Sequence, residues 1–172
     1  MDTEVVSIFE VDVLEALAEV INANGLEQTE REKHPLSAHH SIKSASLRIP
    51  APTGDKVWDI FNQVKTIDSP LAKIYPACYS LCLGLAKILN AKSLGRIMIA
   101  MLPAGKNIDK HTDEGDYPDY YDRFHIFLSG NCEWNETKME AGNVYSVNNS
   151  KPHQVVGGHE DRISIIVDLK VN

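Results

Sequence analysis

Hydrophobic residues recur at three- and four-residue spacing in the first half of the chain. This period places apolar side chains on one face of a helix. It predicts helices over residues 11–24, 55–64 and 78–90, the second of them capped by Thr53 or Asp55. The first half is therefore predicted to be largely helical.

The pattern changes at Gly95, after which short β-rich runs alternate with turn signals formed by Gly and Asn. One similar run, residues 42–49, lies in the first half. The second-half runs predicted as strands are 96–102, 107–111, 123–128, 143–147, 154–156 and 162–169. Short strands at this spacing favour a sandwich or barrel, here a jelly roll of two small sheets. We expect an α+β fold that is mainly β.

No stretch rich in Pro, Gly or Ser separates the two halves. We therefore expect one domain over residues 1–172, in which the helices of residues 1–94 pack as a buttress on the β-rich core of residues 95–172. A length of 172 residues with 43% hydrophobic content is sufficient for one such core.

The net charge and the cysteines indicate which partners and which cellular compartment to expect. A formal net charge of −7 disfavours nucleic acid, because no positive field is available to hold a phosphate backbone. The three cysteines form no Cys-x-x-Cys pair, which fits a reducing cytoplasm. The start of the chain lacks the features of a signal peptide, and no apolar run is long enough to span a membrane. We expect a cytoplasmic protein without a membrane partner.

The candidate chemistry centres on two histidines and one aspartate. In an extended strand His111 and Asp113 project to the same side, and His153 from a distant strand completes two imidazoles and one carboxylate. Such a set occupies one face of a ferrous ion and leaves the other open. The alternatives are a chance His-x-Asp, a solvated His111 at a strand end, and a surface His153 in a turn after Pro152.

Two arginines and a third histidine lie on the predicted strands. Arg162 opens an apolar strand, where its guanidinium suits a bidentate pair with a carboxylate; the alternative is an edge arginine paired with a neighbouring acidic residue. Arg123 and His125 alternate in phase with Phe127 and out of phase with Phe124. That polar face either meets solvent or lines a site inside a barrel.

Several of these motifs, taken in order, resemble the aspartyl/asparaginyl β-hydroxylase family of iron(II)- and 2-oxoglutarate-dependent oxygenases. The resemblance covers residues 95–169 and extends more loosely into residues 41–48. The residues that carry it are Gly95-Arg96-Ile97, Leu102-Pro103-Ala104-Gly105, Ile108, His111, Asp113, Arg123-Phe124-His125, Glu140-Ala141-Gly142, Asn148-Asn149, His153-Gln154-Val155, Arg162-Ile163-Ser164 and Val167-Asp168.

The resemblance implies a cupin-like double-stranded β-helix with iron(II) in its mouth. It places the metal ligands at His111, Asp113 and His153. Arg162 falls on the arginine that binds the distal carboxylate of 2-oxoglutarate, His125 on a histidine beside this co-substrate, and Arg123 on an arginine that holds substrate. The implied reaction consumes O2 and 2-oxoglutarate and hydroxylates an aspartyl/asparaginyl-type peptide side chain or a small amino acid-like molecule, releasing succinate and CO2.

The chain departs from the animal aspartyl hydroxylase at two positions. That enzyme has glycine where this chain has Asp113, so this chain looks more like members with a complete triad. It also has a serine that helps to bind 2-oxoglutarate where this chain has Ala100. The departure at Ala100 leaves part of the co-substrate pocket without an assigned residue.

Alternative functions are still possible at this point, and several residues have no assigned role. A cupin-like metal-binding sensor or scaffold without oxygenase activity is the main alternative, and nucleobase demethylation is disfavoured by the acidic charge. Three tyrosines in the acidic loop 113–122 form either a lid or a solvated loop: Tyr117, Tyr120 and Tyr121. His39, His40 and Arg48 are candidates to reach the site, although we expect the two histidines at the surface.

Overall fold

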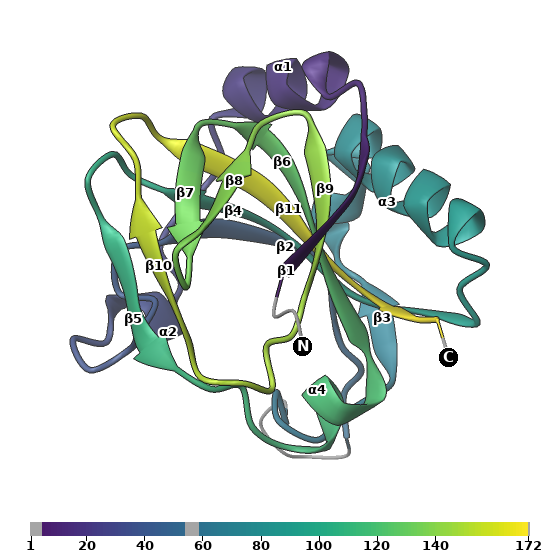
Figure 1. Cartoon of the computed structure of the whole chain (residues 1–172). Coiled ribbons are helices and arrows are strands. Elements are labelled where there is room, and N and C mark those ends of the chain that lie inside the picture. The colour runs from purple at the N-terminus through teal and green to yellow at the C-terminus, as the bar shows by residue number, and fades with distance from the viewer. Residues whose placement is uncertain (1–4, 54–58, 172) are drawn as a thin grey trace.

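The computed structural model describes residues 5–53 and 59–171, which form two antiparallel sheets facing each other (Figure 1). The larger sheet consists, in spatial order, of β1 (Val5–Glu10), β9 (Asn143–Val147), β6 (Asp122–Ser129), β11 (Arg162–Lys170), β4 (Ser93–Leu102), β2 (Lys43–Pro50) and β3 (Thr66–Asp68). The smaller sheet consists of β5 (Asn107–His111), β10 (His153–Gly157), β7 (Asn131–Trp134) and β8 (Thr137–Glu140).

Two longer helices, α1 (Leu14–Ala23) and α3 (Pro76–Ile88), lie on the outer side of the larger sheet, away from the smaller one (Figure 1). The short helical segments are α2 (Glu30–Lys33), the 3-10 helix η1 (Pro70–Lys73) and α4 (Asp116–Tyr120). Within the described residues no helix is both long and apolar enough to cross a membrane.

Strand β11 explains how the larger sheet separates its two faces. Its odd-numbered residues, among them Ile163 and Ile165, belong to the core under α1 and α3. Its even-numbered residues Arg162, Ser164 and Asp168 are buried on the opposite face, toward the smaller sheet. Burying one isoleucine side chain contributes about 1.5–3 kcal/mol, so the apolar face fixes which side each polar residue occupies.

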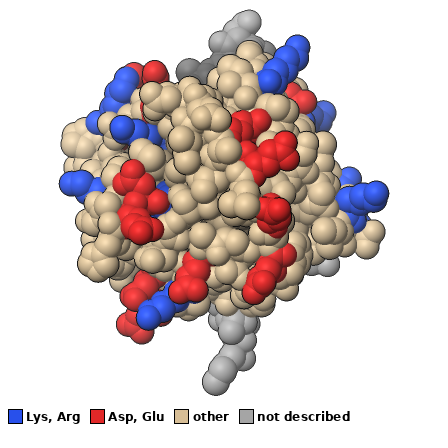
Figure 2. Space-filling view, turned by 90° about the horizontal axis from the view of Figure 1, so that it is seen from above, with Lys and Arg blue, Asp and Glu red and all other residues tan. Residues whose placement is uncertain are grey.

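A second apolar cluster joins the two sheets. It includes Phe127 of the larger sheet and Cys132, Trp134 and Met139 of the smaller one. Figure 2 looks down on the molecule from above, where acidic side chains lie across the middle of the face and Lys and Arg lie mainly near its margins.

Most predicted elements are confirmed. The first and third predicted helices correspond to α1 and α3, and each predicted strand has a counterpart whose bounds differ by three residues or fewer: β2, β4, β5, β6, β9, β10 and β11. The mainly β jelly-roll class is confirmed as well.

The predicted helix over residues 55–64 is wrong where it can be compared. Residues 55–58 lie outside the described residues, and residues 59–64 contain a turn over 60–62 and no helix. The Asp59 carboxylate accepts hydrogen bonds from the backbone N–H groups of Phe61 and Asn62, at 3.0 Å each. This local bonding offers the backbone an alternative to a helix.

The N-terminal part is also less helical than predicted. Strand β1 pairs with β9, and β2 pairs with β4, so this part supplies strands to the larger sheet in addition to its helices. The hairpin β7–β8 was not predicted either. Its loop residues Asn135 and Glu136 have φ of 43° and 70°, the left-handed values that a tight two-residue hairpin turn requires, without the glycine that usually signals it.

Candidate metal and co-substrate site

The three predicted metal ligands lie together at one end of the strand pair β5–β10. His111 ends β5 and His153 begins β10, and the two residues are direct partners in the antiparallel register. Their ring centroids lie 4.2 Å apart. Asp113 follows two residues after His111, and one of its carboxylate oxygens lies 3.6 Å from His111 Nε2. The structure thus brings all three predicted residues to one place.

The hydrogen bonds of the two imidazoles leave their outer nitrogens available. His111 Nδ1 lies 2.7 Å from the carbonyl oxygen of Asp109, and His153 Nδ1 lies 2.9 Å from that of Lys151. A carbonyl only accepts, so in both rings Nδ1 carries the proton and Nε2 carries the lone pair. His111 Nε2 is buried without a hydrogen-bond partner among the described residues. This arrangement is typical of histidines that bind a metal.

Asp113 is held by two donors on the same oxygen. Arg123 Nη1 donates to Asp113 Oδ2 at 2.6 Å, and the Asn149 side-chain amide donates to it at 2.7 Å. The backbone N–H of Asp113 also donates to the Asn149 carbonyl at 3.0 Å. Burial opposes ionisation, but Arg123 and Asn149 prevail and lower the pKa of Asp113 well below its ordinary value. Asp113 is therefore an ionised carboxylate whose second oxygen faces His111.

Arg123 is fully engaged by carboxylates. Its Nε and Nη2 donate to the two oxygens of Asp168 at 2.8 and 3.0 Å, while Nη1 binds Asp113. Burial opposes the charge, but Asp168 and Asp113 raise the pKa of Arg123. The resemblance implied that Arg123 holds substrate, whereas in this structure the guanidinium links a site carboxylate to the central strand β11.

Arg162 lies at the other end of the same face, 2% exposed, with its guanidinium carbon 5.7 Å from the centre of the Phe127 ring. Burial lowers its pKa, and its Nε has no hydrogen-bond partner among the described residues. Ser164 Oγ and His125 Nδ1 are likewise buried and unpartnered in the described structure. Buried polar groups are nearly always hydrogen-bonded, so this cluster has donors for a ligand that carries a carboxylate.

Ser164 was not singled out from the sequence, and its position bears on Ala100. The two residues are direct register partners on β11 and β4. The hydroxyl that the animal aspartyl hydroxylase carries at the Ala100 position is therefore matched here by a hydroxyl on the adjacent strand. The alternation along β11 could have drawn attention to Ser164, because Ser164 shares the even-numbered face of this strand with Arg162. The register that places Ser164 opposite Ala100 could not be read from the sequence.

Arg96 is a further arginine with unpartnered donor atoms, and sequence reasoning left it without a role. It lies on β4 and stacks on the Tyr117 ring at 3.5 Å, and its Nε and Nη2 are buried without hydrogen-bond partners among the described residues. The buried carboxylate of Asp168 interacts with Arg96 through its charge but is hydrogen-bonded to Arg123 and to the Tyr117 hydroxyl. The loop tyrosine Tyr117 is thus 1% exposed and packed, not solvated.

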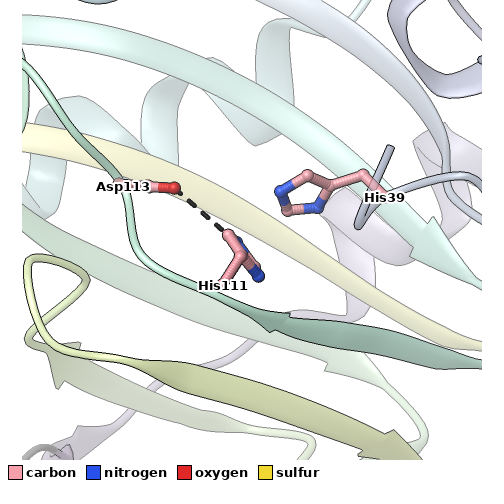
Figure 3. Close-up of side chains that lie close together, drawn as sticks. All are labelled: His39, His111 and Asp113. Atoms are coloured by element: carbon pink, nitrogen blue, oxygen red, sulfur yellow. Dashed lines mark ion pairs between the residues drawn. The ribbon is translucent and has the colours of Figure 1, made fainter. Parts of the chain in front are cut away.

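His39 corrects one expectation. Figure 3 shows its ring directed toward His111 and Asp113, and donor atoms of these three residues all lie within 4.8 Å of one another. Its ring centroid is 4.6 Å from that of His111, and burial, followed by the proximity of His111, lowers the pKa of His39 to about 3. His39 is therefore a neutral imidazole at the site, whereas it was expected at the surface.

The neighbouring candidates do not share this position. His40 is exposed, as expected. Arg48 is engaged elsewhere by Asp68, Thr66 and the carbonyl of Gly95. His153 is outside the 4.8 Å group, and its ring stacks on Trp134 with centroids 4.3 Å apart and planes 7° from parallel.

Two solved structures share this architecture. An oxidoreductase of the 2OG-Fe(II) oxygenase family from Burkholderia pseudomallei matches with a TM-score of 0.62 at 13% identity, over 99% of this chain and 87% of that one. A prolyl-4-hydroxylase from Pseudomonas putida matches with a TM-score of 0.52 at 12% identity, over 98% and 93%. The double-stranded β-helix fold is thereby confirmed. No protein-family model and no curated protein matches the sequence.

Proposed function

We propose that the protein is an iron(II)- and 2-oxoglutarate-dependent dioxygenase. The observation that carries the proposal is the presence of two kinds of group, one from each sheet. Two imidazoles of the smaller sheet, each hydrogen-bonded to a carbonyl through Nδ1, meet the ionised carboxylate of Asp113, and the larger sheet supplies the buried guanidinium of Arg162, whose Nε has no hydrogen-bond partner among the described residues. The same fold occurs in an oxidoreductase of the 2OG-Fe(II) oxygenase family, which supports this assignment.

In this proposal the residues of the chain bind and orient. His111, Asp113 and His153 hold iron(II), which when bound activates O2 with the electrons of 2-oxoglutarate. Arg162 pairs with the distal carboxylate of 2-oxoglutarate, and Ser164 and His125 donate hydrogen bonds beside it. Arg123 keeps Asp113 ionised and correctly turned. The products are a hydroxylated substrate, succinate and CO2.

For the substrate we propose an aspartyl/asparaginyl-type side chain in a peptide, or a small amino acid-like molecule. The resemblance to the aspartyl/asparaginyl β-hydroxylases supports this class. Because Arg123 is occupied by two carboxylates, Arg96 is the arginine with unpaired buried donors near this end of the site. Buried N–H groups without hydrogen-bond partners are costly, and a carboxylate of the substrate relieves the cost at Arg96 Nε and Nη2.

We further propose that the protein works in a reducing cytoplasm, with a small molecule or peptide as partner and not nucleic acid or a membrane. Its three cysteines are free and buried, which agrees with a compartment in which disulfides do not form.

Succinate release tests the reaction. Purified protein with iron(II), ascorbate and 2-oxoglutarate is screened against free amino acids and Asp- or Asn-containing peptides. Wild-type protein should form succinate, and His111→Ala, Asp113→Ala and His153→Ala should each lower the rate at least a hundredfold. His159→Ala, at an exposed loop position, is the matched control and should retain the rate. Full succinate formation by His153→Ala would refute this ligand set.

A metal-binding sensor or scaffold module without oxygenase activity is the second candidate, and the nearness of His39 favours it. A third imidazole beside the predicted triad leaves fewer coordination positions for a co-substrate. Anaerobic titration of the ferrous protein with 2-oxoglutarate separates the two functions. A visible charge-transfer band supports the oxygenase, and metal binding without any such band supports the second candidate.

A further inference from the structure

His39, His111 and Asp113 form a group of described residues whose possible metal-binding atoms all lie within 4.8 Å of one another. With metal–ligand bonds of about 2.0–2.2 Å, two donors on one ion stand about 3–4.4 Å apart. The observed limit of 4.8 Å therefore exceeds the requirement by only a few tenths of an ångström. Small rotations of the three side chains suffice to close it.

The backbone holds His39 in this position. The carbonyl of Ala38 accepts a hydrogen bond from the N–H of Asp109 at 3.2 Å, and the same residue Asp109 fixes the ring of His111. The segment carrying His39 is thus attached directly to the strand that carries His111. The His39 ring itself makes no hydrogen bond to described residues, and its edge packs on the His111 ring at an interplanar angle of 79°.

The adjacent histidine shows that this placement is specific. His40 Nδ1 lies 3.0 Å from the carbonyl of Ser37, and its side chain is 43% exposed. Two successive histidines on the same turn therefore differ sharply, one directed into the site and one directed outward.

We propose that His39 is a fourth, displaceable protein ligand of the metal, bound in the absence of 2-oxoglutarate and released when 2-oxoglutarate binds. The release of His39 by 2-oxoglutarate rests on the proposed function, and the binding of the metal by His39 does not. Three protein ligands leave three positions on a six-coordinate ion, and 2-oxoglutarate needs two of them. With His39 bound, co-substrate and O2 have two positions between them, so turnover requires His39 to leave.

The segment around His39 consists of turns and not of a sheet strand. Its turns are closed by short-range bonds from the N–H of His40 to the carbonyl of Ser37 and from the N–H of Ile42 to the carbonyl of His39. Contacts to Asp109 and the packing of Ala38 on the second apolar cluster hold the backbone, so His39 is released by rotation of its side chain. The consequence is a metal site that cannot hold 2-oxoglutarate and O2 together until His39 has left.

Cobalt(II) provides the test, because its visible spectrum reports ligand number without turnover. Wild-type protein, His39→Ala, His39→Gln and the control His40→Ala are titrated with Co(II), with and without 2-oxoglutarate, after circular dichroism has verified folding. Without 2-oxoglutarate, both His39 variants should bind Co(II) at least tenfold more weakly than wild type, and His40→Ala should match wild type. With saturating 2-oxoglutarate the difference should disappear.

Pulsed electron paramagnetic resonance of the Cu(II)-loaded protein counts imidazoles independently. We expect one coordinated imidazole fewer in His39→Gln than in wild type, and the same loss in wild type on adding 2-oxoglutarate. Equal Co(II) affinity and equal imidazole number in wild type and both His39 variants would overturn the proposal. If 2-oxoglutarate leaves the wild-type spectra unchanged while the His39 variants still bind Co(II) weakly, the displacement and the oxygenase assignment fail, and the ligand role of His39 stands.

Discussion

The individual residues of the site divide into those that a sequence pattern can find and those that only the register reveals. His111, Asp113 and His153 drew attention by their types and spacing, whereas the role of Arg162 came from the resemblance to a known family. Ser164 is an ordinary serine in the sequence, and it becomes informative only when it is seen to be buried, unpartnered among the described residues and opposite Ala100. A residue whose role depends on its partner in a neighbouring strand is difficult to recognise from one sequence.

This position of Ser164 gives a prediction for co-substrate binding. Ser164→Ala should raise the Kd of 2-oxoglutarate about tenfold, because a hydrogen bond to a charged group is worth about 1.5 kcal/mol or more. The double variant Ser164→Ala/Ala100→Ser returns a hydroxyl to the register pair and should recover much of the affinity. Calorimetry on the Mn(II)-loaded protein measures both, with Ala100→Ser as the control. An unchanged Kd in Ser164→Ala would exclude the hydroxyl from the pocket.

His39 was named as a candidate but was expected at the surface, for a related reason. Its segment of turns carries no period, so nothing in the pattern shows which of two successive histidines faces inward. The direction is set by a backbone contact between this segment and β5, which lie far apart in the sequence.

At the scale of elements, the close approach of β4 to α4 holds the inner end of the site together. The Tyr117 hydroxyl accepts from the N–H of Arg96 at 2.7 Å and donates to Asp168 at 3.0 Å. Gly95 permits this approach, because a Cβ there would lie 2.7 Å from the Tyr117 hydroxyl oxygen and 2.9 Å from the carbonyl oxygen of Asp168. The missing side chain is therefore a requirement of packing.

Substitution at this glycine should destabilise the fold. Gly95→Ala is expected to lower the free energy of unfolding by about 1–3 kcal/mol, since the contact with backbone cannot be relieved by a flexible side chain. Gly84 is the control: it is exposed on α3, and a Cβ added there would meet no described atom within 4 Å. Gly84→Ala should stabilise by about 0.5–1 kcal/mol. Urea denaturation measures both, and equal effects in the two variants would contradict the packing argument.

For the whole molecule, the class of fold could be predicted from the sequence, but the pairing of the strands could not. Short β-rich runs and turn signals predicted seven strands of the jelly roll, and the three- and four-residue spacing of apolar residues predicted both long helices. The pairing of β1 with β9 and of β2 with β4 was not predicted, because partners so distant in sequence are selected by the shape of the completed sheet. The N-terminal part was accordingly described as a buttress when it also supplies strands.

The burial of several imidazoles makes the stability of the whole molecule depend on pH. Burial, and then Arg162, lowers the pKa of His125 well below its ordinary value, and burial also lowers the pKa of His39 and His153. Below pH about 6.5 the unfolded chain binds protons on these groups that the folded chain does not bind. Stability is therefore full above that pH and falls as the pH decreases.

Each such histidine contributes a slope of at most about 1.4 kcal/mol per pH unit. The metal-free wild-type protein should lose unfolding free energy steadily from pH 7 to pH 5, and His125→Phe should lose it less steeply by up to that amount. Denaturant titrations at several pH values measure the slope. Parallel curves for the two proteins would show that His125 is protonated equally in both states.

Strand β11 also bears on how the chain reaches this fold. A shift of one residue against β4 and β6 would turn Arg162 and Asp168 toward α1 and α3 and would turn Ile163 and Ile165 toward the site. Burying a guanidinium and a carboxylate among apolar side chains without partners costs several kcal/mol. The charged residues of the site therefore make the misaligned sheet less stable than the native one, even when no ligand is bound.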